Sequence, residues 1–229
     1  MFILIIFLAF SLNQIIQANY MSQCDQDKFV NETFFKNKKG GVFVEIGAYN
    51  GIHLSNSYFF EKELEWQGLC VEPIPEAFEE LIKNRSCICV QGCVAAESGI
   101  VDFLRLTGVS TLLSGVVDKY DPKHLERIDR EQSLFPEEVF KNIIQVNCYT
   151  LNDLLEKNKF YNVDYLSIDT EGGELSILKS IDFQKFHIEI IDVENNYDDP
   201  ATRLFLESVG YEFVTKLKQD EIYKRKSLN

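Results

Sequence analysis

The sequence lacks the features that would direct it to a nucleic acid, a structural zinc ion or a repeat architecture. Acidic residues outnumber basic ones by 36 to 23, so the formal net charge is −13 at pH 7 and a phosphate backbone would be repelled. The three histidines are scattered and the six cysteines include no Cys-x-x-Cys pair, which excludes the common zinc ligand sets. No internal repeat, low-complexity tract or heptad run is present, which excludes solenoids and long coiled coils.

No apolar run is long enough to predict a membrane-spanning helix, but residues 2–10 are continuously apolar. That length is typical of the core of a signal peptide, and Ala18 is the candidate residue before cleavage. No Lys or Arg precedes the core, so an uncleaved anchor and a true start at Met21 stay open for residues 1–18. A functional signal predicts the secretory pathway (ER or Golgi lumen) or secretion, with transient membrane association through the N-terminus. Without one, we expect a cytoplasmic protein.

The cysteines leave the redox compartment open. Their even number permits disulfides in an oxidising lumen. Cys87 and Cys89, however, alternate along a predicted strand, where buried free thiols are an equally good interpretation.

The remaining sequence is long enough for one domain, which we place at residues 40–229 after a polar lead-in at residues 19–39. Val42–Ile46 is an apolar run that passes into a loop with glycines at 47 and 51. Ser55, Asn56 and Ser57 are candidate N-caps for an amphipathic segment at 58–64. The order predicts a strand, a tight loop and a helix.

The glycine loop is the first candidate binding site. Gly47 lets the backbone turn and lets a ligand approach, and we expect loop N–H groups to face that ligand. The spacing Glu45-x-Gly47-x-x-x-Gly51 lacks the second glycine of Gly-x-Gly-x-x-Gly. A nucleotide-sugar or NAD-dependent enzyme is therefore disfavoured.

A second predicted strand, residues 67–72, ends in Glu72 and is followed by Pro73. An acid about twenty residues beyond a glycine loop is typical of a carboxylate that binds ribose hydroxyls. Residues 87–94 read as a third strand, and the end of that strand lies beside the base in such folds. Val94 and Ala95 are therefore expected to flank adenine.

Acidic residues also follow two later predicted strands. Asp169 ends the strand at 163–169, with Glu171 and Glu174 close behind it, and Glu194 and Asn195 end the strand at 187–194. Ligands of open α/β sheets bind outside the carboxyl ends of the strands. We therefore expect four strand-end acids to converge on one rim: Glu45, Glu72, Asp169 and Glu194. An acidic rim suits a sulfonium ligand with ribose hydroxyls better than a phosphate.

Residues 107–142, called the excursion below, break the alternation of strands and helices. The segment is long, charged and contains Pro122, so it is predicted to lie over the site. It also carries His124.

Taken together, these motifs resemble the FkbM family of S-adenosylmethionine (SAM) methyltransferases. The resemblance covers about residues 41–225 and is carried by Phe43–Gly51, Leu54–Asn56, Cys70–Pro73 and Ser167–Glu174. It implies an α/β fold of the Rossmann-like class I methyltransferase type, a seven-stranded mostly parallel sheet with helices on both faces. It also implies that SAM is bound by residues of the motifs and the third strand: Glu45, Gly47, Ala48, Gly51, Ser55, Asn56, Glu72, Pro73, Val94 and Ala95.

The expected reaction is methyl transfer to a hydroxyl of a sugar or another small acceptor. Asp169 is the predicted acceptor-side carboxylate and His124 a candidate base, with a surface helix histidine as its alternative. Asp169, Glu194 and Asn195 are hard oxygen ligands of the kind that hold Mg²⁺ in some O-methyltransferases of this fold. The alternative function is a non-catalytic FkbM-like adaptor of the secretory pathway, with a trafficking role similar to that of the regulator Star.

Overall fold

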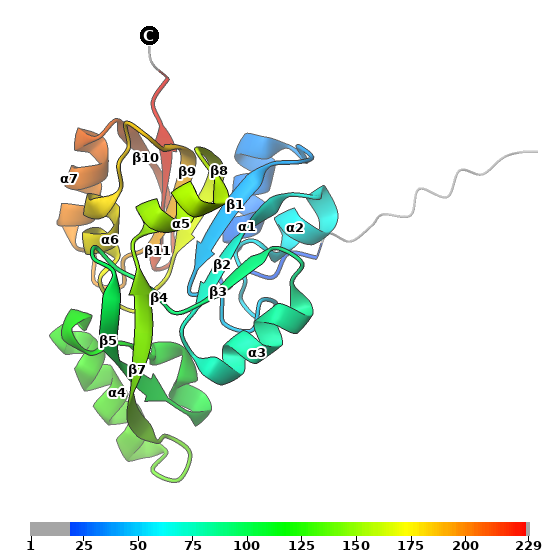
Figure 1. Ribbon diagram of the computed structural model, residues 1–229. Coiled ribbons are helices and arrows are strands. Elements are labelled where there is room, and N and C mark those ends of the chain that lie inside the picture. Colours follow the sequence, from blue (N-terminus) through cyan, green and yellow to red (C-terminus); the bar gives the residue numbers. More distant parts are fainter. Residues whose placement is uncertain (1–18, 228–229) are drawn as a thin grey trace, which may run out of the picture.

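The computed structural model describes residues 19–227, so the predicted signal segment lies outside the described residues. The larger of two sheets forms the centre of the molecule (Figure 1). Its strands are β1 (Val42–Ile46), β2 (Gln67–Glu72), β3 (Ile88–Gln91), β8 (Asn162–Ile168), β9 (His187–Glu194), β10 (Tyr211–Leu217) and β11 (Asp220–Arg225).

The order across this sheet is β10-β11-β9-β8-β1-β2-β3. All neighbours pair in parallel except β11, which is antiparallel to both β9 and β10. Strand order reverses at β1, which lies between β2 and β8, and such a switch point is where open α/β sheets bind ligands. The seven-stranded, mostly parallel, Rossmann-like α/β fold predicted from the sequence is confirmed.

Helices cover both faces of the sheet because its inner strands are apolar on both sides. Val44 and Ile46 of β1 pack with the face that contacts α5–α7, whereas Phe43 packs on the face that contacts α1–α3. The helical elements are α1 (Gln26–Val30), the π-helical η1 (Asn31–Phe35), α2 (Tyr58–Leu64), α3 (Pro75–Asn84), η2 (Gly108–Leu113), η3 (Val117–Lys119), α4 (Pro122–Leu134), α5 (Leu151–Asn158), α6 (Glu174–Ser180) and α7 (Pro200–Ser208).

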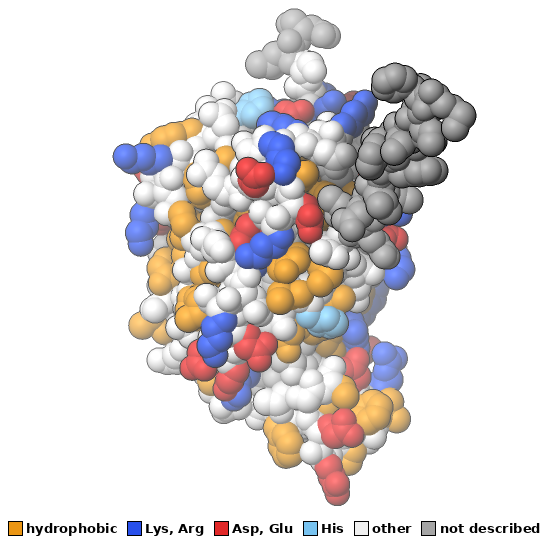
Figure 2. All heavy atoms as spheres, turned by 90° about the vertical axis from the view of Figure 1, so that its right-hand side faces the viewer, with side chains coloured by type: hydrophobic (Ala, Val, Ile, Leu, Met, Phe, Trp, Pro, Cys, Tyr) orange, Lys and Arg blue, Asp and Glu red, His pale blue; other side chains and the backbone are white. Residues whose placement is uncertain are grey.

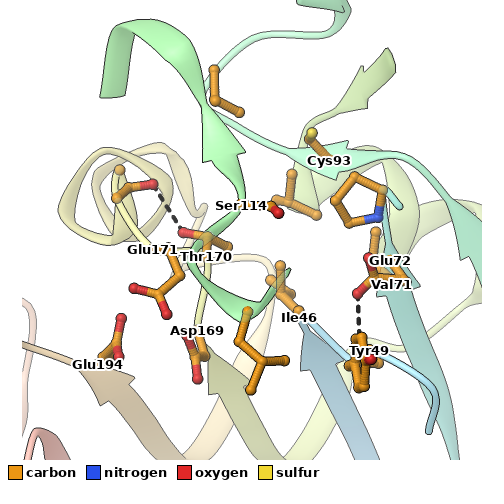
Figure 3. Close-up of a pocket in the computed structure, with 18 of the residues that line it drawn as sticks. Ile46, Tyr49, Val71, Glu72, Cys93, Ser114, Asp169, Thr170, Glu171 and Glu194 are labelled. Atoms are coloured by element: carbon orange, nitrogen blue, oxygen red, sulfur yellow. Dashed lines mark hydrogen bonds between the residues drawn. The ribbon is translucent and has the colours of Figure 1, made fainter. Parts of the chain in front are cut away.

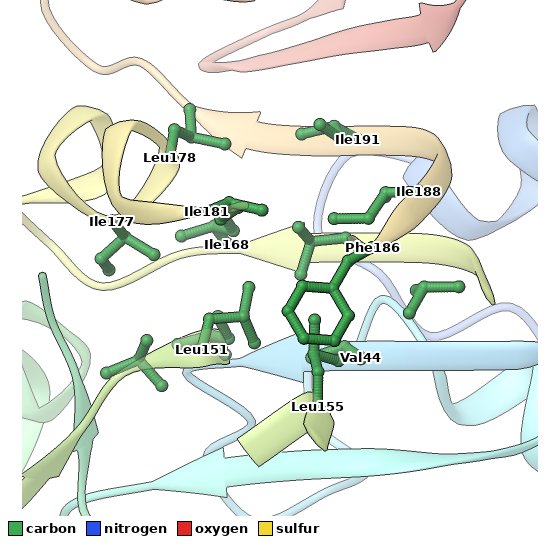
Figure 4. Close-up of a cluster of buried hydrophobic side chains, with 14 of the residues drawn as sticks. Val44, Leu151, Leu155, Ile168, Ile177, Leu178, Ile181, Phe186, Ile188 and Ile191 are labelled. Atoms are coloured by element: carbon green, nitrogen blue, oxygen red, sulfur yellow. The ribbon is translucent and has the colours of Figure 1, made fainter. Parts of the chain in front are cut away.

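The largest apolar cluster lies between the sheet and α5–α7 (Figure 4). Leu151 and Leu155 of α5 and Leu178 of α6 are fully buried against Val44, Ile188 and their neighbours on the strands. Each such side chain contributes about 1.5–3 kcal/mol by leaving water. This cluster fixes β1, β8 and β9 in register and so fixes where their carboxyl ends lie.

The second sheet, in the order β4-β7-β5-β6, is built from β4 (Cys93–Val94), β5 (Gly99–Leu106), β6 (Gly115–Val116) and β7 (Lys141–Tyr149). β5 and β7 form a long antiparallel pair that carries the excursion away from the main sheet (Figure 1). The predicted single strand at 87–94 is wrong, because the chain bends at Gly92 (φ +147°) and passes from one sheet to the other.

On the face shown in Figure 2, acidic, basic and hydrophobic side chains are interspersed. Within residues 19–227, no helix combines the length and the apolar character that crossing a membrane requires.

Candidate functional site

A cavity of about 320 Å³ opens at the carboxyl ends of β1, β2, β8 and β9, within the size range of small-molecule sites. The excursion supplies the opposite wall through Leu112–Ser114, Val116 and Lys119. Glu72 lies at one end of the cavity and Asp169, Glu171 and Glu194 at the other (Figure 3).

Gly47 lines the cavity and lies against the backbone of Asp169. Its φ of +87° is a left-handed conformation, and a β-carbon there would lie 1.8 Å from the carbonyl oxygen of Asp169. No other residue type fits, because glycine alone combines that conformation with no side chain. Gly47 and Ala48 both line the cavity, but their N–H groups donate to the carbonyl of Val71. The prediction that these N–H groups face a ligand is therefore wrong.

The rest of the glycine loop is held by Glu45. Its buried carboxylate accepts hydrogen bonds from the Ser55 hydroxyl (2.8 Å), the Asn56 N–H (2.6 Å) and the Ser57 hydroxyl (2.6 Å). Glu45 is absent from the cavity lining, whereas Ser55 and Asn56 belong to it. Glu45 therefore holds the loop in place through hydrogen bonds and does not face the cavity. This position does not fit the predicted contact with the cofactor.

Arg85, at the end of α3, neutralises Glu45 in the interior. Its guanidinium lies 3.3 Å from the Glu45 carboxylate and 2.5 Å from that of Glu61, and it also donates to the carbonyl of Gly51. Burial raises the pKa of Glu61, but the Arg85 charge and several hydrogen bonds outweigh it and bring that pKa down to about 2. A β-carbon at Gly51 would meet the side chains of Leu81 and Arg85. Gly51 serves helix packing and does not line the cavity, contrary to its predicted role.

Glu72 occupies the end of the cavity predicted to hold ribose. One carboxylate oxygen accepts from the Tyr49 N–H (2.8 Å) and the other from the Ile74 N–H (2.7 Å), which fixes its orientation. Burial raises its pKa to about 7. A carboxylate has about four acceptor sites, so two stay free for hydroxyl donors. The other predicted residues in this lining are Pro73, Val94 and Ala95, beside Cys93 and Phe103.

The opposite end of the cavity holds an acidic cluster of Asp169, Glu171 and Glu194, whose ligand atoms all lie within 4.8 Å of one another. The three side chains point toward one another in Figure 3. Burial and the charge of Asp220 raise the pKa of Asp169 to about 8. Burial and the charge of Asp169 raise the pKa values of Glu171 and Glu194 as well. Like charges in a poorly solvated site are costly unless a cation or a proton offsets them.

The turn after β8 brings Glu171 into the cluster. Glu171 has a φ of +58°, which is unusual for a side chain of its size, and Gly172 and Gly173 also have positive φ. The turn is stabilised by Glu174, whose carboxylate accepts from the Thr170 and Gly172 N–H groups. Glu171 was not among the predicted metal ligands, although it lies between Asp169 and Glu174 in the sequence.

Asn195 does not line the cavity, so its predicted part in a metal site does not fit the structure. Its side chain accepts from the Asp199 N–H and donates to the Asp199 carbonyl, which ties it to the start of α7. Glu171 takes the third place instead.

His124 is neither a surface residue nor a cavity residue. It is 1% exposed, stacks on Tyr120 with 5.1 Å between ring centroids, and places Nδ1 3.4 Å from Glu171 Oε2. Burial lowers its pKa. It therefore lies behind Glu171, which does not fit the predicted role of an acceptor-side base.

The predicted lead-in also contributes to the site. Gln23 and Gln26 line the cavity, and so do His53, Lys119 and Arg127. The lead-in reaches the site because Ser22 pairs with Leu54 as an isolated bridge and Asp27 accepts from the Met21 N–H and the Ser22 hydroxyl. The contact between the lead-in and the site could not be predicted from local sequence patterns, because Ser22 and Leu54 are distant in the sequence.

Comparison with known proteins places these features in a family context. A family model described as "Methyltransferase FkbM domain" matches residues 45–213. Similar solved structures include methyltransferase FkbM from Methylobacillus flagellatus KT, at 11% identity and a TM-score of 0.46, covering 82% of this chain and 44% of that one. Precorrin-6y C5,15-methyltransferase from Geobacter metallireducens GS-15 is 14% identical with a TM-score of 0.46, covering 88% and 87%.

The N-terminal domain of human METTL16 in complex with SAH is 11% identical with a TM-score of 0.43, covering 86% of this chain and 65% of that one. This chain thus spans less than half of the M. flagellatus protein. A search of curated proteins found no match.

Proposed function

Because the chain belongs to the FkbM methyltransferase family, we propose that it transfers the methyl group of SAM to a hydroxyl of a sugar or another small hydroxylated acceptor. The observation that supports this best is one continuous cavity with Glu72 at one end and an acidic cluster at the other. A ligand with ribose hydroxyls at one end and a positively charged sulfonium toward the other matches that distribution of acceptors and charge.

The chain's own residues would bind and orient both reactants. Glu72 would accept hydrogen bonds from ribose hydroxyls, with Val94 and Ala95 beside the base. At the acidic end, Asp169 would accept a hydrogen bond from the acceptor hydroxyl and so align its oxygen for in-line displacement. The excursion, through Leu112–Ser114, would cover the acceptor and keep water from the reacting atoms.

We further propose that Asp169, Glu171 and Glu194 hold Mg²⁺. The donor set fits, because it consists of three carboxylates, and Glu171 Oε2 is buried without a hydrogen-bond partner. When bound, a divalent cation acidifies a hydroxyl that coordinates it. His124 Nδ1 lies 3.4 Å from Glu171 Oε2 and makes no hydrogen bond to it, which leaves that oxygen free for a cation.

Titration calorimetry with SAM and SAH tests the proposal. We expect micromolar binding, and a loss of about tenfold or more in Glu72→Ala because two buried N–H groups and the ribose contacts are left without an acceptor. Glu76→Ala is the matched control, since its side chain is 63% exposed and pairs with Arg105 outside this cavity. No heat from a folded wild type would reject the enzyme and support the adaptor.

Turnover is then measured with methyl-labelled SAM and a panel of hydroxylated acceptors, with the label located in the product. Label on a nitrogen or carbon would contradict O-methylation. Turnover that is unchanged by EDTA and by added Mg²⁺ would contradict metal use while leaving SAM binding intact.

A further inference from the structure

Two cysteines that are distant in the sequence lie opposite each other where the two sheets meet. Cys93 of β4 and Cys148 of β7 are direct register partners in a parallel pair. Both are buried in one apolar cluster with Phe103 and Val146, so their side chains lie on the same face of the second sheet. Cys93 also lines the cavity beside Val94 and Ala95 (Figure 3).

The distance between neighbouring strands is compatible with a covalent link. Strands lie about 4.7–4.9 Å apart, and disulfides join residues whose Cα atoms are about 4.4–6.8 Å apart. β4 is only two residues long and follows the bend at Gly92, so this strand end can adjust more easily than a strand interior.

The two thiols affect each other's ionisation. The neighbouring Cys93 thiol lowers the pKa of Cys148, whereas the Cys148 thiol and burial raise the pKa of Cys93, so Cys148 is the better nucleophile of the pair. Cys70 and Cys87 form the competing pair, with sulfurs 3.6 Å apart. Burial raises the pKa of Cys70 well above its usual value, its thiol contacts the Glu45 carboxylate, and neither thiol lines the cavity.

We propose that Cys93 and Cys148 form a disulfide within the second sheet, which ties β7, one strand of the pair that carries the excursion, to β4 at the predicted adenine end of the cavity. Glutathione disulfide is the oxidant. One protein thiolate attacks a glutathione sulfur and releases one glutathione thiolate. The other thiol loses its proton, attacks the resulting mixed disulfide and releases the second glutathione, so two electrons pass to the oxidant.

The test is to incubate the full chain in glutathione buffers from reducing to oxidising, block free thiols with N-ethylmaleimide, digest without reduction and map linked peptides by mass spectrometry. We expect a Cys93–Cys148 peptide pair in oxidising buffer and two blocked thiols in reducing buffer. Closing this long loop should raise the Tm by roughly 5–10 °C. Free thiols at both positions in oxidising buffer, or links to other cysteines, would overturn the proposal.

Matched variants strengthen the test. Cys24→Ala removes a buried thiol outside the pair and should keep both the link and the Tm shift, whereas Cys148→Ala should lose both. If Cys148→Ala does not fold, peptide mapping of the wild type still decides. The mapping needs no bound SAM, so it can fail or succeed independently of the methyltransferase proposal.

Discussion

The backbone of Asp169 lies directly against Gly47. A β-carbon at residue 47 would lie 1.8 Å from the Asp169 carbonyl oxygen, and the Asp169 N–H donates to the Ile46 carbonyl at 3.0 Å. The close approach joins the ends of β1 and β8 and brings the glycine loop beside the acidic cluster. The missing side chain of Gly47 therefore allows the backbone of Asp169 to lie beside the end of β1.

We expect Gly47→Ala to lower the free energy of unfolding by more than about 3 kcal/mol, because it adds a steric clash with backbone to left-handed strain. Gly40→Ala is the control. Gly40 also has a positive φ, +68°, but no atom lies within 4 Å of its missing β-carbon, so it should cost about 1–2 kcal/mol from strain alone. Denaturant unfolding of both variants measures the difference. Equal costs would show that the contact with Asp169 relaxes.

Arg85 gives a second prediction, on stability. Replacing it with Met leaves Glu45 and Glu61 buried without a cation, so we expect a loss of about 3–5 kcal/mol. Arg105→Met is the comparison, because its ion pair with Glu76 is exposed and should be worth at most about 1 kcal/mol. Urea denaturation at constant pH compares the two. A cost near 1 kcal/mol for Arg85→Met would mean that water enters to solvate the carboxylates.

The strand-end positions of Glu72, Asp169 and Glu194 could be predicted from the sequence because they depend on local patterns and on one rule of parallel sheets. The partner of Glu45 could not, since Arg85 lies 40 residues away and looks like any helix-terminal arginine. The burial of His124 could not be predicted from the sequence either. His124 belongs to a charged helix, but Tyr120 and Glu171 pack against it.

The same limit explains the corrected metal ligands. Asn195 and Glu171 are both polar residues just beyond a strand end, and the sequence treats them alike. A left-handed backbone turns Glu171 toward Asp169, whereas hydrogen bonds to Asp199 turn Asn195 away. Side-chain direction in an irregular loop depends on such local geometry rather than on periodicity.

If the acidic cluster binds Mg²⁺, the difference in Tm between the Glu194→Gln variant and the wild type should change sign when Mg²⁺ is added. At pH 9 without divalent cations, above the pKa of about 8 of Asp169, Glu194→Gln relieves charge repulsion in the cluster and should raise the Tm by about 2–4 °C. With saturating Mg²⁺ the wild type gains binding free energy that the variant lacks, so the order should reverse. Thermal unfolding with EDTA or Mg²⁺ measures this, and Glu189→Gln, on the same strand but paired with His187 at the surface, should change little in either. The same shift with and without Mg²⁺ would argue against the metal site.

Glu72 predicts how SAM binding depends on pH. Burial raises the pKa of this carboxyl to about 7 in the folded protein, from 4.5. The folded state therefore holds a proton that the unfolded chain has released between these values. That contribution to stability is complete below pH 4.5 and is lost, by about 3 kcal/mol, as the pH rises through 7.

Binding should run in the opposite direction to stability, because the ionised carboxylate is the stronger acceptor for ribose hydroxyls. We expect the affinity for SAH to rise by up to about tenfold from pH 6 to pH 8, and Glu72→Gln, which does not titrate, to bind more weakly with a flat profile. Calorimetry across this range measures the affinity, and denaturant unfolding of the same two proteins measures the stability difference. A variant whose binding keeps the wild-type slope would assign the pH dependence to a different group and remove Glu72 from the ribose site.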